Sequence, residues 1–564
     1  MSADGDENGA GERGTESPYT LRREESGEAR HVFWADAVAD RVEDREPDEP
    51  IVVKGGISPS GVPHLGNVNE IMRGYYVAEV LRERGHEVRQ VFTADDRDPL
   101  RKLPRTLCDL EGNLVDLGDV DAGALGRNLG TPYTDVPDPF GCCDSYGDHF
   151  STIIQDSADA VDAPIDLVST TDLYESGELD DVTRYVLEHQ ARAREVLSQY
   201  QDKVDEDYVP FNPICENCGK ITETVTGVDL DAETLTVDYR CTDMDAGDRT
   251  IEGCGHEGTV TIREGKMPWR FEWPGQWQAL GVDFEPFGKD HAEGSWPSGQ
   301  DVARNVLEIE PPVPMVYEWF TLEGEPFSSS EGNVILVSDV LELLEPKVLR
   351  YFFAKDPSRA RDFSIERLDQ LVDEFDRFEA IYFGEIEAGE DEKAFADRVY
   401  PLVVEEPREE RIRLPYTFAA VLGMTDDPDL REEIARREGH VPDDAPEWAV
   451  EGALERVERA RNWARRTENE FDYELKRSEI PAHDFDEATE EALAELADFV
   501  EEGHEPDEIQ GEIYETAKRH DVDVGEFFGA GYRLFFDEEQ GPKLGPFLGK
   551  VDREFVVARL RRER

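Results

Sequence analysis

The stretch from Ile51 to Asp96 most constrains the fold of this chain. An apolar run, IVVKG, is followed by the loop GISPSGVPHLGN (Gly56 to Asn67), a helix-like segment from about Asn69 to Arg84, and a second apolar run, EVRQVFTA, that ends before Asp95 and Asp96. This order predicts a βαβ unit with two parallel strands. Because ligands bind at the carboxyl ends of such strands, we expect the loop and the Asp95 Asp96 pair to face one crevice.

The loop itself is rich in glycine, proline and serine and places a histidine where the helix should begin. Glycine lets a backbone approach a ligand closely, and a helix N-terminus offers unpaired N–H groups to anionic oxygens. The loop therefore predicts a phosphate site. It has neither the GxGxxG spacing of dinucleotide-binding folds nor the GxxxxGK[ST] spacing of P-loops, so neither of those classes is supported.

The charge of the chain is extreme, with 60 basic against 131 acidic residues and a formal net charge of −71 over 564 residues. The acids are spread over every segment, which is typical of a solvated anionic surface and suggests a halophilic source. Nucleic acid is not excluded as a partner, because at ~1 M salt the Debye length is only ~3 Å and local contacts decide. We find neither an apolar run of membrane-spanning length nor a signal peptide, so we expect a cytoplasmic protein with no membrane partner.

The last two hundred residues read as helical. From Ser364, which is placed to cap a helix, apolar residues recur at helical spacing as far as Ile381. Similar patterns fill ALERVERARNWARR and EEALAELADFVEEG. The segment FFGAGYRLFF could stack on RNA bases, but a packed helix pair is the simpler interpretation.

Four of the seven cysteines predict a structural zinc site: Cys215 and Cys218 in CENCGK, then Cys241 and Cys254. A CxxC knuckle followed by two further cysteines suits tetrahedral zinc, and His256 is an alternative fourth ligand to Cys254. The remaining cysteines, Cys108 and the Cys142 Cys143 pair, lack a metal-like arrangement in the sequence. We expect them to be buried small apolar residues.

Three segments in a fixed order then resemble class I aminoacyl-tRNA synthetases. The loop fits the HIGH-type signature at Pro59, Gly61, His64, Leu65, Gly66 and Asn67. SSSEGN (Ser328 to Asn333) resembles the KMSKS loop, and GKDH (Gly288 to His291) resembles the Gly-x-Asp element that holds a ribose.

Four further segments resemble class I lysyl-tRNA synthetases in sequence: ADDRDPLRKLP, DPFGCCDSYGDHF, MPWRFEWPGQWQALGVDFEPFGKDH and GPKLGPFLG. The resemblance extends from about Phe33 to Gly549. This resemblance implies an α/β fold: a Rossmann-type parallel-sheet catalytic domain with a zinc-bearing insertion, followed by an all-α anticodon-binding domain. The implied parts are a disordered acidic tail (1–30), two catalytic halves (31–104 and 266–340), an insertion (105–265, zinc module around 215–256), a stem-contact connector (341–370) and the anticodon-binding domain (371–564).

The implied activity is ligation of L-lysine to tRNA(Lys) through a lysyl-adenylate, with ATP and Mg²⁺, by a monomer. The alternatives are another class I synthetase of the Glu, Gln or Cys type, or a nucleotidyltransferase of the HIGH superfamily that uses no tRNA. The implied catalytic residues are His64, Asn67, Ser328 and Ser330. The implied ATP-binding residues are Pro59, Gly61, His64, Gly66, Asn67, Gly288, Asp290, Ser328, Ser329 and Ser330.

The implied lysine-binding residues are Gly56, Ser58, Asp95, Trp269, Trp273 and His291. Gly56 and Ser58 would contact the main-chain part of lysine, and Asp95 or Glu272, with Trp269 or Trp273, would receive its ammonium. One departure concerns the KMSKS-like loop, because Pro326 and Ser329 stand where the family carries lysines. Lys289 is a candidate to replace them.

Overall fold

The structure is a computed structural model that describes residues 17–19, 21, 31–202, 204–230, 234–247, 249–327, 333–409, 411–477 and 480–563. The chain divides into two compact units. The first comprises residues 1–338, 350–363 and 397–403, and the second comprises residues 339–349, 364–396 and 404–564.

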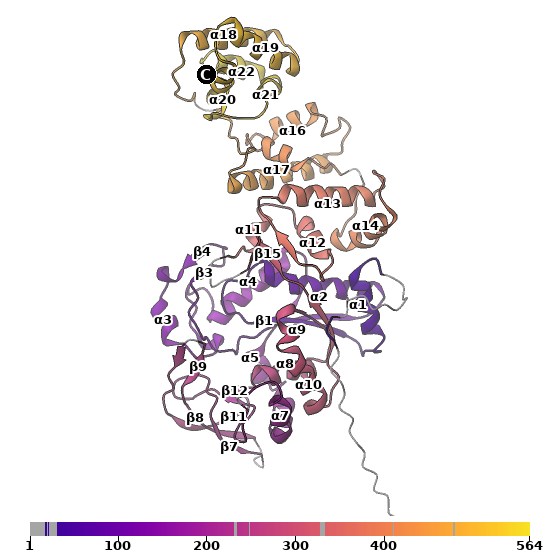
Figure 1. Ribbon diagram of the computed structural model, residues 1–564, viewed down its shortest axis with the longest axis vertical. Coiled ribbons are helices and arrows are strands. Elements are labelled where there is room, and N and C mark those ends of the chain that lie inside the picture. Colours follow the sequence, from indigo (N-terminus) through magenta and orange to yellow (C-terminus); the bar gives the residue numbers. More distant parts are fainter. Residues whose placement is uncertain are drawn as a thin grey trace, which may run out of the picture. The chain divides into compact units, whose positions relative to one another are not determined.

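A five-stranded parallel sheet forms the centre of the first unit (Figure 1). Its strands are β1 (Ile51–Ile57), β2 (Val88–Ala94), β5 (Asp166–Ser169), β13 (Val282–Gly288) and β14 (Val313–Tyr317). They lie in the order β14-β13-β1-β2-β5. The apolar run that begins β1 is buried, as a strand covered on both faces requires. The predicted βαβ unit and Rossmann-type sheet are confirmed.

The order of the strands places a ligand crevice beside β1. The chain leaves β1 toward β2 on one side and later returns to β13 on the other. Loops that follow two such strands diverge and leave a gap at their carboxyl ends. Ser58 follows β1, Asp95 follows β2 and Asp290 follows β13, so all three reach the same edge of the sheet.

Helix α2 (Leu65–Glu83) connects β1 to β2 and is buried along most of its length. It begins four residues earlier than the sequence pattern predicts, because His64 caps it. Helix α1 (Trp34–Glu43) packs on α2, as the amphipathic pattern of that segment requires. The other helices of the first unit before β13 are α3 (Ala122–Arg127), α4 (Tyr146–Ala160), α5 (Thr170–Ser176), α6 (Asp180–Glu188), α7 (Gln190–Leu197) and α8 (Trp269–Leu280).

The region predicted as one insertion, 105–265, is divided by β5, which is an edge strand of the main sheet. The predicted boundaries therefore need correction, since only the parts before and after β5 lie outside the sheet. Its short strands are β3 (Thr106–Cys108), β4 (Leu114–Asp116), β6 (Asn212–Pro213), β7 (Val225–Asp229), β8 (Thr236–Arg240), β9 (Met244–Ala246), β10 (Arg249–Ile251), β11 (Glu257–Thr261) and β12 (Gly265–Lys266).

After β13 the first unit continues with short elements around the sheet edge. They are α9 (Lys289–Glu293), α10 (Trp296–Val302), β15 (Phe320–Leu322), β16 (Glu325–Pro326) and β17 (Arg361–Phe363). Helices α11 (Val337–Leu341) and α12 (Pro346–Ala354) each contribute residues to both units. No helix within the described ranges has the length and apolar character needed to cross a bilayer.

The second unit is helical, as predicted. Its helices are α13 (Leu368–Tyr382), α14 (Glu390–Val403, whose last residues belong to the first unit), α15 (Tyr416–Leu422), α16 (Pro428–Arg437), α17 (Glu447–Thr467), α18 (Glu487–Glu502), α19 (Pro506–Arg519), α20 (Val524–Phe536), α21 (Leu544–Lys550) and α22 (Arg553–Leu560). Helix α13 begins at Leu368 and its N-cap residue is Arg367, so the prediction that Ser364 caps this helix is wrong. Phe527, Phe535 and Phe536 of α20 are buried, which favours the packed-helix interpretation of FFGAGYRLFF.

Candidate active site

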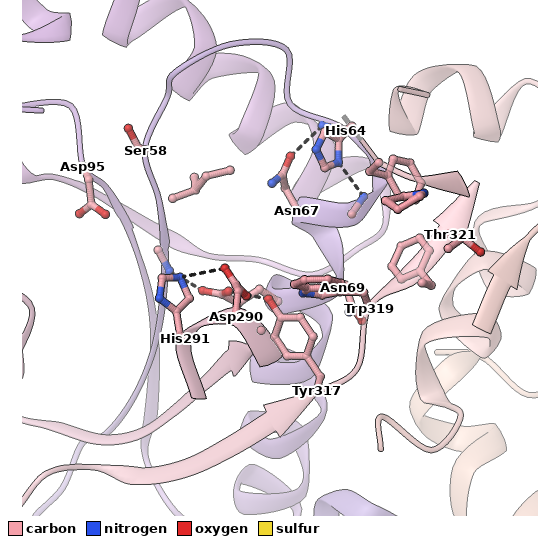
Figure 2. A pocket seen from close by; sticks show the side chains of 18 of the residues that line it. Ser58, His64, Asn67, Asn69, Asp95, Asp290, His291, Tyr317, Trp319 and Thr321 are labelled. Carbon is pink, nitrogen blue, oxygen red and sulfur yellow. Dashed lines mark hydrogen bonds and ion pairs between the residues drawn. The ribbon is translucent and has the colours of Figure 1, made fainter. Parts of the chain in front are cut away.

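A cavity of about 630 Å³ opens at the carboxyl ends of the strands of the parallel sheet (Figure 2). Figure 2 shows Ser58 and Asp95 at one end of this cavity and His64 and Thr321 at the other. Its lining residues are Gly56, Ile57, Ser58, His64, Gly66, Asn67, Asn69, Glu70, Asp95, Asp98, Trp269, Gly288, Asp290, His291, Tyr317, Trp319, Phe320, Thr321, Pro326 and Phe327. The predicted residues Pro59, Gly61 and Trp273 do not line it. Ser328, Ser329 and Ser330 lie outside the described residues.

His64 both caps α2 and faces the cavity. Its Nδ1 accepts a hydrogen bond from the Gly66 N–H at 3.1 Å, and its own N–H donates to Asn67 Oδ1 at 2.9 Å. Burial lowers the pKa of His64 to about 4, so the imidazole is neutral at pH 7. An Nδ1 that accepts leaves the single ring proton on Nε2. His64 is therefore held as a neutral donor.

The backbone N–H groups of the same helix end are already bonded. Leu65 N donates to Ile335 O at 2.9 Å, Asn67 N donates to His64 O at 2.8 Å, and the Gly66 N–H is taken by the imidazole. The prediction that free N–H groups of this terminus would bind phosphate is therefore wrong for these three groups. The Nε2 proton of His64, the side-chain amide of Asn67 and the positive end of the helix dipole are still available to an anion.

Glu70 is a lining residue that the sequence pattern did not reveal. Its Oε1 accepts from the Gly56 N–H at 2.8 Å and its Oε2 accepts from the Tyr317 hydroxyl at 2.8 Å, which ties β1 to β14. Burial raises the pKa of Glu70 to about 7. Gly56 has no room for a side chain, because a Cβ there would lie 2.2 Å from Thr93 Oγ1.

Asp95, Asp98 and Trp269 line the cavity together with His291. Asp95 is 5% exposed, and its Oδ1 accepts from Thr170 Oγ1 and Gln276 Nε2, both at 3.2 Å. Burial raises the pKa of Asp95. A carboxylate in such a place is stabilised by a cation that enters beside it.

Trp273 and Glu272, two of the residues considered for binding the lysine ammonium, lie behind the residues that form the wall of the cavity. Trp273 is 2% exposed, stacks on Trp269 with ring centroids 5.5 Å apart, and donates its indole N–H to Glu285 Oε1 at 3.0 Å. Glu272 is fully buried and accepts from Lys266 Nζ at 2.8 Å. Both residues support the wall rather than face the cavity.

Gly288, Asp290 and two aromatic rings also line the cavity. Gly288 ends β13 where a Cβ would lie 2.6 Å from Asp290 Oδ1, so glycine lets the Asp290 carboxylate fold back over the strand end. Trp319 is 54% exposed, although it lines the cavity. Phe327 stacks on the His64 ring with centroids 5.0 Å apart. Sequence reasoning missed Trp319 because it considered only tryptophans of the segment that begins at Met267.

The charge of the lining is one-sided. Among the described lining residues there are four carboxylates, Glu70, Asp95, Asp98 and Asp290, and neither a lysine nor an arginine. Pro326, at one of the lysine positions of the KMSKS-like pattern, is exposed at the rim. Lys289 does not line the cavity, and its Nζ pairs with Glu318 Oε2 at 3.0 Å. The cavity suits a cationic substrate.

Comparison with known proteins decides the family. Residues 32–406 match the family described as "tRNA synthetases class I (K)". The chain belongs to this family. Among its relatives is a protein named "Lysine--tRNA ligase" from Halobacterium salinarum, 72% identical over 535 residues that cover 94% of this chain and 97% of the relative.

Two further relatives have the same name, and their sequence identity to this chain differs widely. The protein from Haloarcula marismortui is 69% identical over 97% of this chain and 99% of its own length. The protein from Pyrococcus furiosus is 34% identical over 94% of this chain and all of its own length. The relatives from salt-loving archaea fit the halophilic source that the charge predicts.

The four predicted zinc ligands of this synthetase come together. The sulfur atoms of Cys215, Cys218, Cys241 and Cys254 lie within 4.8 Å of one another. The Cys215–Cys254 and Cys218–Cys241 sulfur distances are 3.6 Å and 3.7 Å. Tetrahedral Zn–S bonds of ~2.3 Å require about 3.8 Å. His256 instead pairs with Glu216 Oε1 at 2.8 Å, which leaves Cys254 as the fourth candidate ligand.

A second group of metal-ligating side chains lies in DPFGCCDSYGDHF. Ligand atoms of Asp138, Cys142, Cys143 and His149 lie within 4.8 Å of one another. Cys142 Sγ is 3.8 Å from Cys143 Sγ and 3.4 Å from His149 Nδ1. His149 Nδ1 is 3.4 Å from Asp138 Oδ1. These separations are those of one tetrahedral ion.

The surroundings of this second group also fit a metal. His149 Nε2 lies 2.8 Å from Cys108 O, the second contact that a ligating imidazole usually makes. Cys142 is exposed, so the expectation that the Cys142 Cys143 pair is buried and unlike a metal site is wrong. Cys108 is buried, as expected. The sequence hid this group because Asp138 and His149 are not spaced like a CxxC knuckle.

Proposed function

We propose that this chain is a lysine–tRNA ligase that activates L-lysine with ATP at the cavity of the parallel sheet. It forms lysyl-adenylate and pyrophosphate, and then transfers lysine to the 3′-terminal adenosine of tRNA(Lys). The observation that carries the proposal is the match along at least 94% of this chain with relatives of that name. The anionic lining of the cavity supports a cationic amino acid as substrate.

Activation needs positioning and electrostatic stabilisation more than covalent chemistry. The lysine carboxylate attacks the α-phosphorus of ATP, and negative charge develops on phosphate oxygens as pyrophosphate leaves. His64 Nε2–H donates a hydrogen bond to one of these oxygens. The Gly66 N–H, which donates to Nδ1, holds the imidazole in the tautomer that makes this possible. Because the imidazole is neutral, it stabilises the transition state without a proton transfer.

The amino acid occupies the end of the cavity formed by Gly56, Ser58, Asp95, Trp269 and His291. Asp95 supplies negative charge, and Trp269 supplies an aromatic face, for the side-chain ammonium of lysine. The Asp98 carboxylate is already paired with Lys266 Nζ. Glu70 accepts hydrogen bonds from the Gly56 N–H and the Tyr317 hydroxyl and so holds both residues in place. The negative charge of a glutamate side chain would be repelled by the Asp95 carboxylate.

The nucleotide occupies the opposite end. Asp290 accepts hydrogen bonds from the ribose hydroxyls, and Trp319 offers an exposed face for adenine. Mg²⁺, which accompanies ATP in this chemistry, neutralises phosphate charge in a cavity whose described lining has no permanent cation. Lys289 is poorly placed to replace the lysines of the KMSKS pattern, because Glu318 already pairs with it.

Both groups of metal-ligating side chains bind structural zinc. In each group four side chains close around one position and leave no open coordination site. Cys215, Cys218, Cys241 and Cys254 would hold the first zinc between the CxxC knuckle, the end of β8 and the segment before β11. Asp138, Cys142, Cys143 and His149 would hold the second between their loop and α4. Neither touches the reacting atoms.

Lysine-dependent ATP–pyrophosphate exchange tests the proposal. The exchange is measured with each standard amino acid in about 2–3 M KCl and again in dilute buffer. We expect exchange with lysine alone, followed by charging of a tRNA(Lys) transcript. Exchange with Glu, Gln or Cys would indicate another class I synthetase, and adenylate formation without tRNA charging would indicate a nucleotidyltransferase.

The same proposal includes a monomeric enzyme that acts in the cytoplasm, where its tRNA substrate is found. Light scattering at the same salt concentration measures the mass of the particle. A particle of twice the chain mass of 63.8 kDa would contradict a monomer.

A further inference from the structure

The helical unit contains a cationic cavity that activation of lysine does not use. Its volume is about 200 Å³, and it lies between α12, α13, α17, Arg408 and residues 411–413. The cations that line it are Lys347, Arg408, Arg411, Arg413 and Arg456. Glu379 is the single carboxylate among the described lining residues. In a chain with 60 basic and 131 acidic residues, such a gathering of cations is unusual.

Three of these arginines are held in place by carboxylates, and the first of them, Arg408, pairs with Glu406. Arg456 pairs with Glu345 at 2.8 Å and with Asp376 at 2.6 Å. Arg413 pairs with Glu379 at 2.8 Å and with Glu385 at 2.6 Å. Apart from Glu379, these carboxylates do not line the cavity. They fix the arginines from outside and leave the cationic side toward the cavity.

Lys347 and Arg411 have hydrogen-bonding capacity left. Within the described ranges Lys347 Nζ has neither a hydrogen bond nor an ion pair, and its contact is with the Phe375 ring, 5.4 Å to the centroid. Arg411 Nε is buried without a hydrogen-bond partner, and the nearest carboxylate oxygen, of Glu379, is 3.8 Å away. Buried donors of this kind cost free energy unless an acceptor completes them.

An aromatic ring lies beside these donors, and we call Trp448 together with Arg408 the aromatic ledge. Arg408 lies over the Trp448 ring, 5.5 Å to the centroid. Gly452 lines the cavity one turn along α17, and a Cβ there would meet no atom within 4 Å. Glycine weakens a helix interior, so its presence at this open point favours close approach of a ligand.

We propose that this cavity binds a backbone phosphate of the tRNA substrate, with a neighbouring base against Trp448, an inference that rests on the proposed function. Lys347 and Arg411 donate to the phosphate oxygens, and Arg408 with Trp448 supplies the stacking face that nucleic-acid sites use. A free phosphate ion would use the same donors but not the ledge. At high salt only such short-range contacts hold RNA, which explains how a chain of net charge −71 binds it.

The test separates tRNA binding from activation. Lys347→Gln, Arg411→Gln and Gly452→Glu are compared with the wild-type chain in about 2–3 M KCl. We expect the KM for a tRNA(Lys) transcript to rise about tenfold in each variant. The two Gln variants each lose one charged hydrogen bond, and Gly452→Glu places a carboxylate in the cavity that repels the phosphate. The kcat and KM of lysine-dependent ATP–pyrophosphate exchange should stay within about twofold of wild type.

Arg377→Gln is the matched control, since Arg377 is an exposed residue of α13 that pairs with Glu392 at 3.2 Å outside the cavity. It should leave the KM for tRNA unchanged. If the two cation variants lose exchange and charging together, their fold is damaged and Gly452→Glu decides, because it keeps every cation. An unchanged KM for tRNA in Gly452→Glu overturns the inference.

Inorganic phosphate separates the two sources of the anion. If phosphate raises the Tm of the wild-type chain but not of Lys347→Gln, while the KM for tRNA is the same in both, the cavity holds free phosphate and the inference is overturned. Absence of lysine-dependent exchange in the wild-type chain would instead contradict the proposed function.

Discussion

His64 Nδ1 accepts the Gly66 N–H at 3.1 Å, so the residue that ends the loop also starts the helix and fixes its own tautomer. The stack of Phe327 on the imidazole, with centroids 5.0 Å apart, further restricts the ring. One hydrogen bond thus links the folding of α2 to the direction of the Nε2 proton. Structure and chemistry at His64 can be separated by a side chain that keeps the cap but is too short to place a donor at the position of Nε2.

His64→Asn is that change. Asparagine caps helices well through its side-chain oxygen, so α2 should form and the Tm should change little. Loss of the Nε2 donor should lower the kcat of lysine-dependent ATP–pyrophosphate exchange about 10²–10³-fold. His64→Ala, which also loses the cap, should in addition lower the Tm. Exchange at the wild-type rate in His64→Asn would contradict the role of the imidazole.

The pH dependence of stability should report the burial of His64. Its pKa lies at about 4 in the folded chain and near the ordinary value of 6.5 when unfolded. Between these values the unfolded state binds the additional proton, so this residue destabilises the folded state as the pH falls from about 6.5 to about 4.

The difference in unfolding free energy between wild type and His64→Asn isolates this effect from the many carboxylates. As the pH falls over that range, the unfolding free energy of wild type should decrease by on the order of 3 kcal/mol relative to that of His64→Asn. Chemical denaturation at pH 7 and at pH 4 in the same salt measures it. A difference that is constant with pH would mean that the imidazole is solvated.

Gly56→Ala should disrupt the end of β1 and be rescued by a second change. The new Cβ would overlap Thr93 Oγ1 at 2.2 Å, and that hydroxyl is buried without a hydrogen-bond partner. Thr93→Ala removes the overlapping atom at little cost in hydrogen bonding. We expect Gly56→Ala to be poorly folded and the double variant to recover most of the Tm, measured by thermal denaturation. If the Tm does not recover, the backbone oxygen of Thr93, 3.2 Å from the same Cβ, is the contact that excludes a side chain at Gly56.

The sequence predicted the parallel sheet because the pattern is local. Strand, loop, helix and strand follow one another between Ile51 and Asp96, and the handedness rule then fixes their arrangement. Membership of β5 in the sheet could not be predicted in this way, since Asp166–Ser169 is short and lies among irregular segments. Its place depends on pairing with β2, a contact distant in sequence.

The site was predicted in part for the same reason. His64, Asp95 and Asp290 follow strands directly, so their common edge could be inferred. Glu70 escaped notice because it lies one turn into α2, where an acidic residue reads as solvated surface in so acidic a chain. Its role depends on Tyr317, whose hydroxyl lies 2.8 Å from Glu70 Oε2 across 247 positions of sequence.

Trp319 should contribute to nucleotide binding. A tryptophan that is 54% exposed at the rim of the cavity gains contact area when adenine stacks on it. Such a stack is worth about 1–3 kcal/mol, so Trp319→Ala should raise the KM for ATP about tenfold or more and leave the KM for lysine unchanged. Trp319→Phe should recover part of the loss. A rise confined to the KM for lysine would place the ring at the amino-acid end instead.

The full chain should carry two zinc ions, and the second should stabilise the wall of the active site. His149 lies on α4, which Ser145 caps, and the hydroxyl of Tyr146 donates to Ser60 O of the HIGH-type loop at 3.1 Å. A metal held by Asp138, Cys142, Cys143 and His149 therefore fixes the helix that touches this loop.

Cys142→Ser should leave one zinc ion per chain by elemental analysis, lower the Tm, and raise the KM for ATP more than the KM for lysine. Cys108→Ala is the matched control, because alanine keeps the backbone oxygen that contacts His149 and the Cys108 thiol is not one of the four ligands. It should retain both ions. If the wild-type chain carries only one ion, the four side chains do not form a metal site, and Tyr146 links α4 to the loop without a metal.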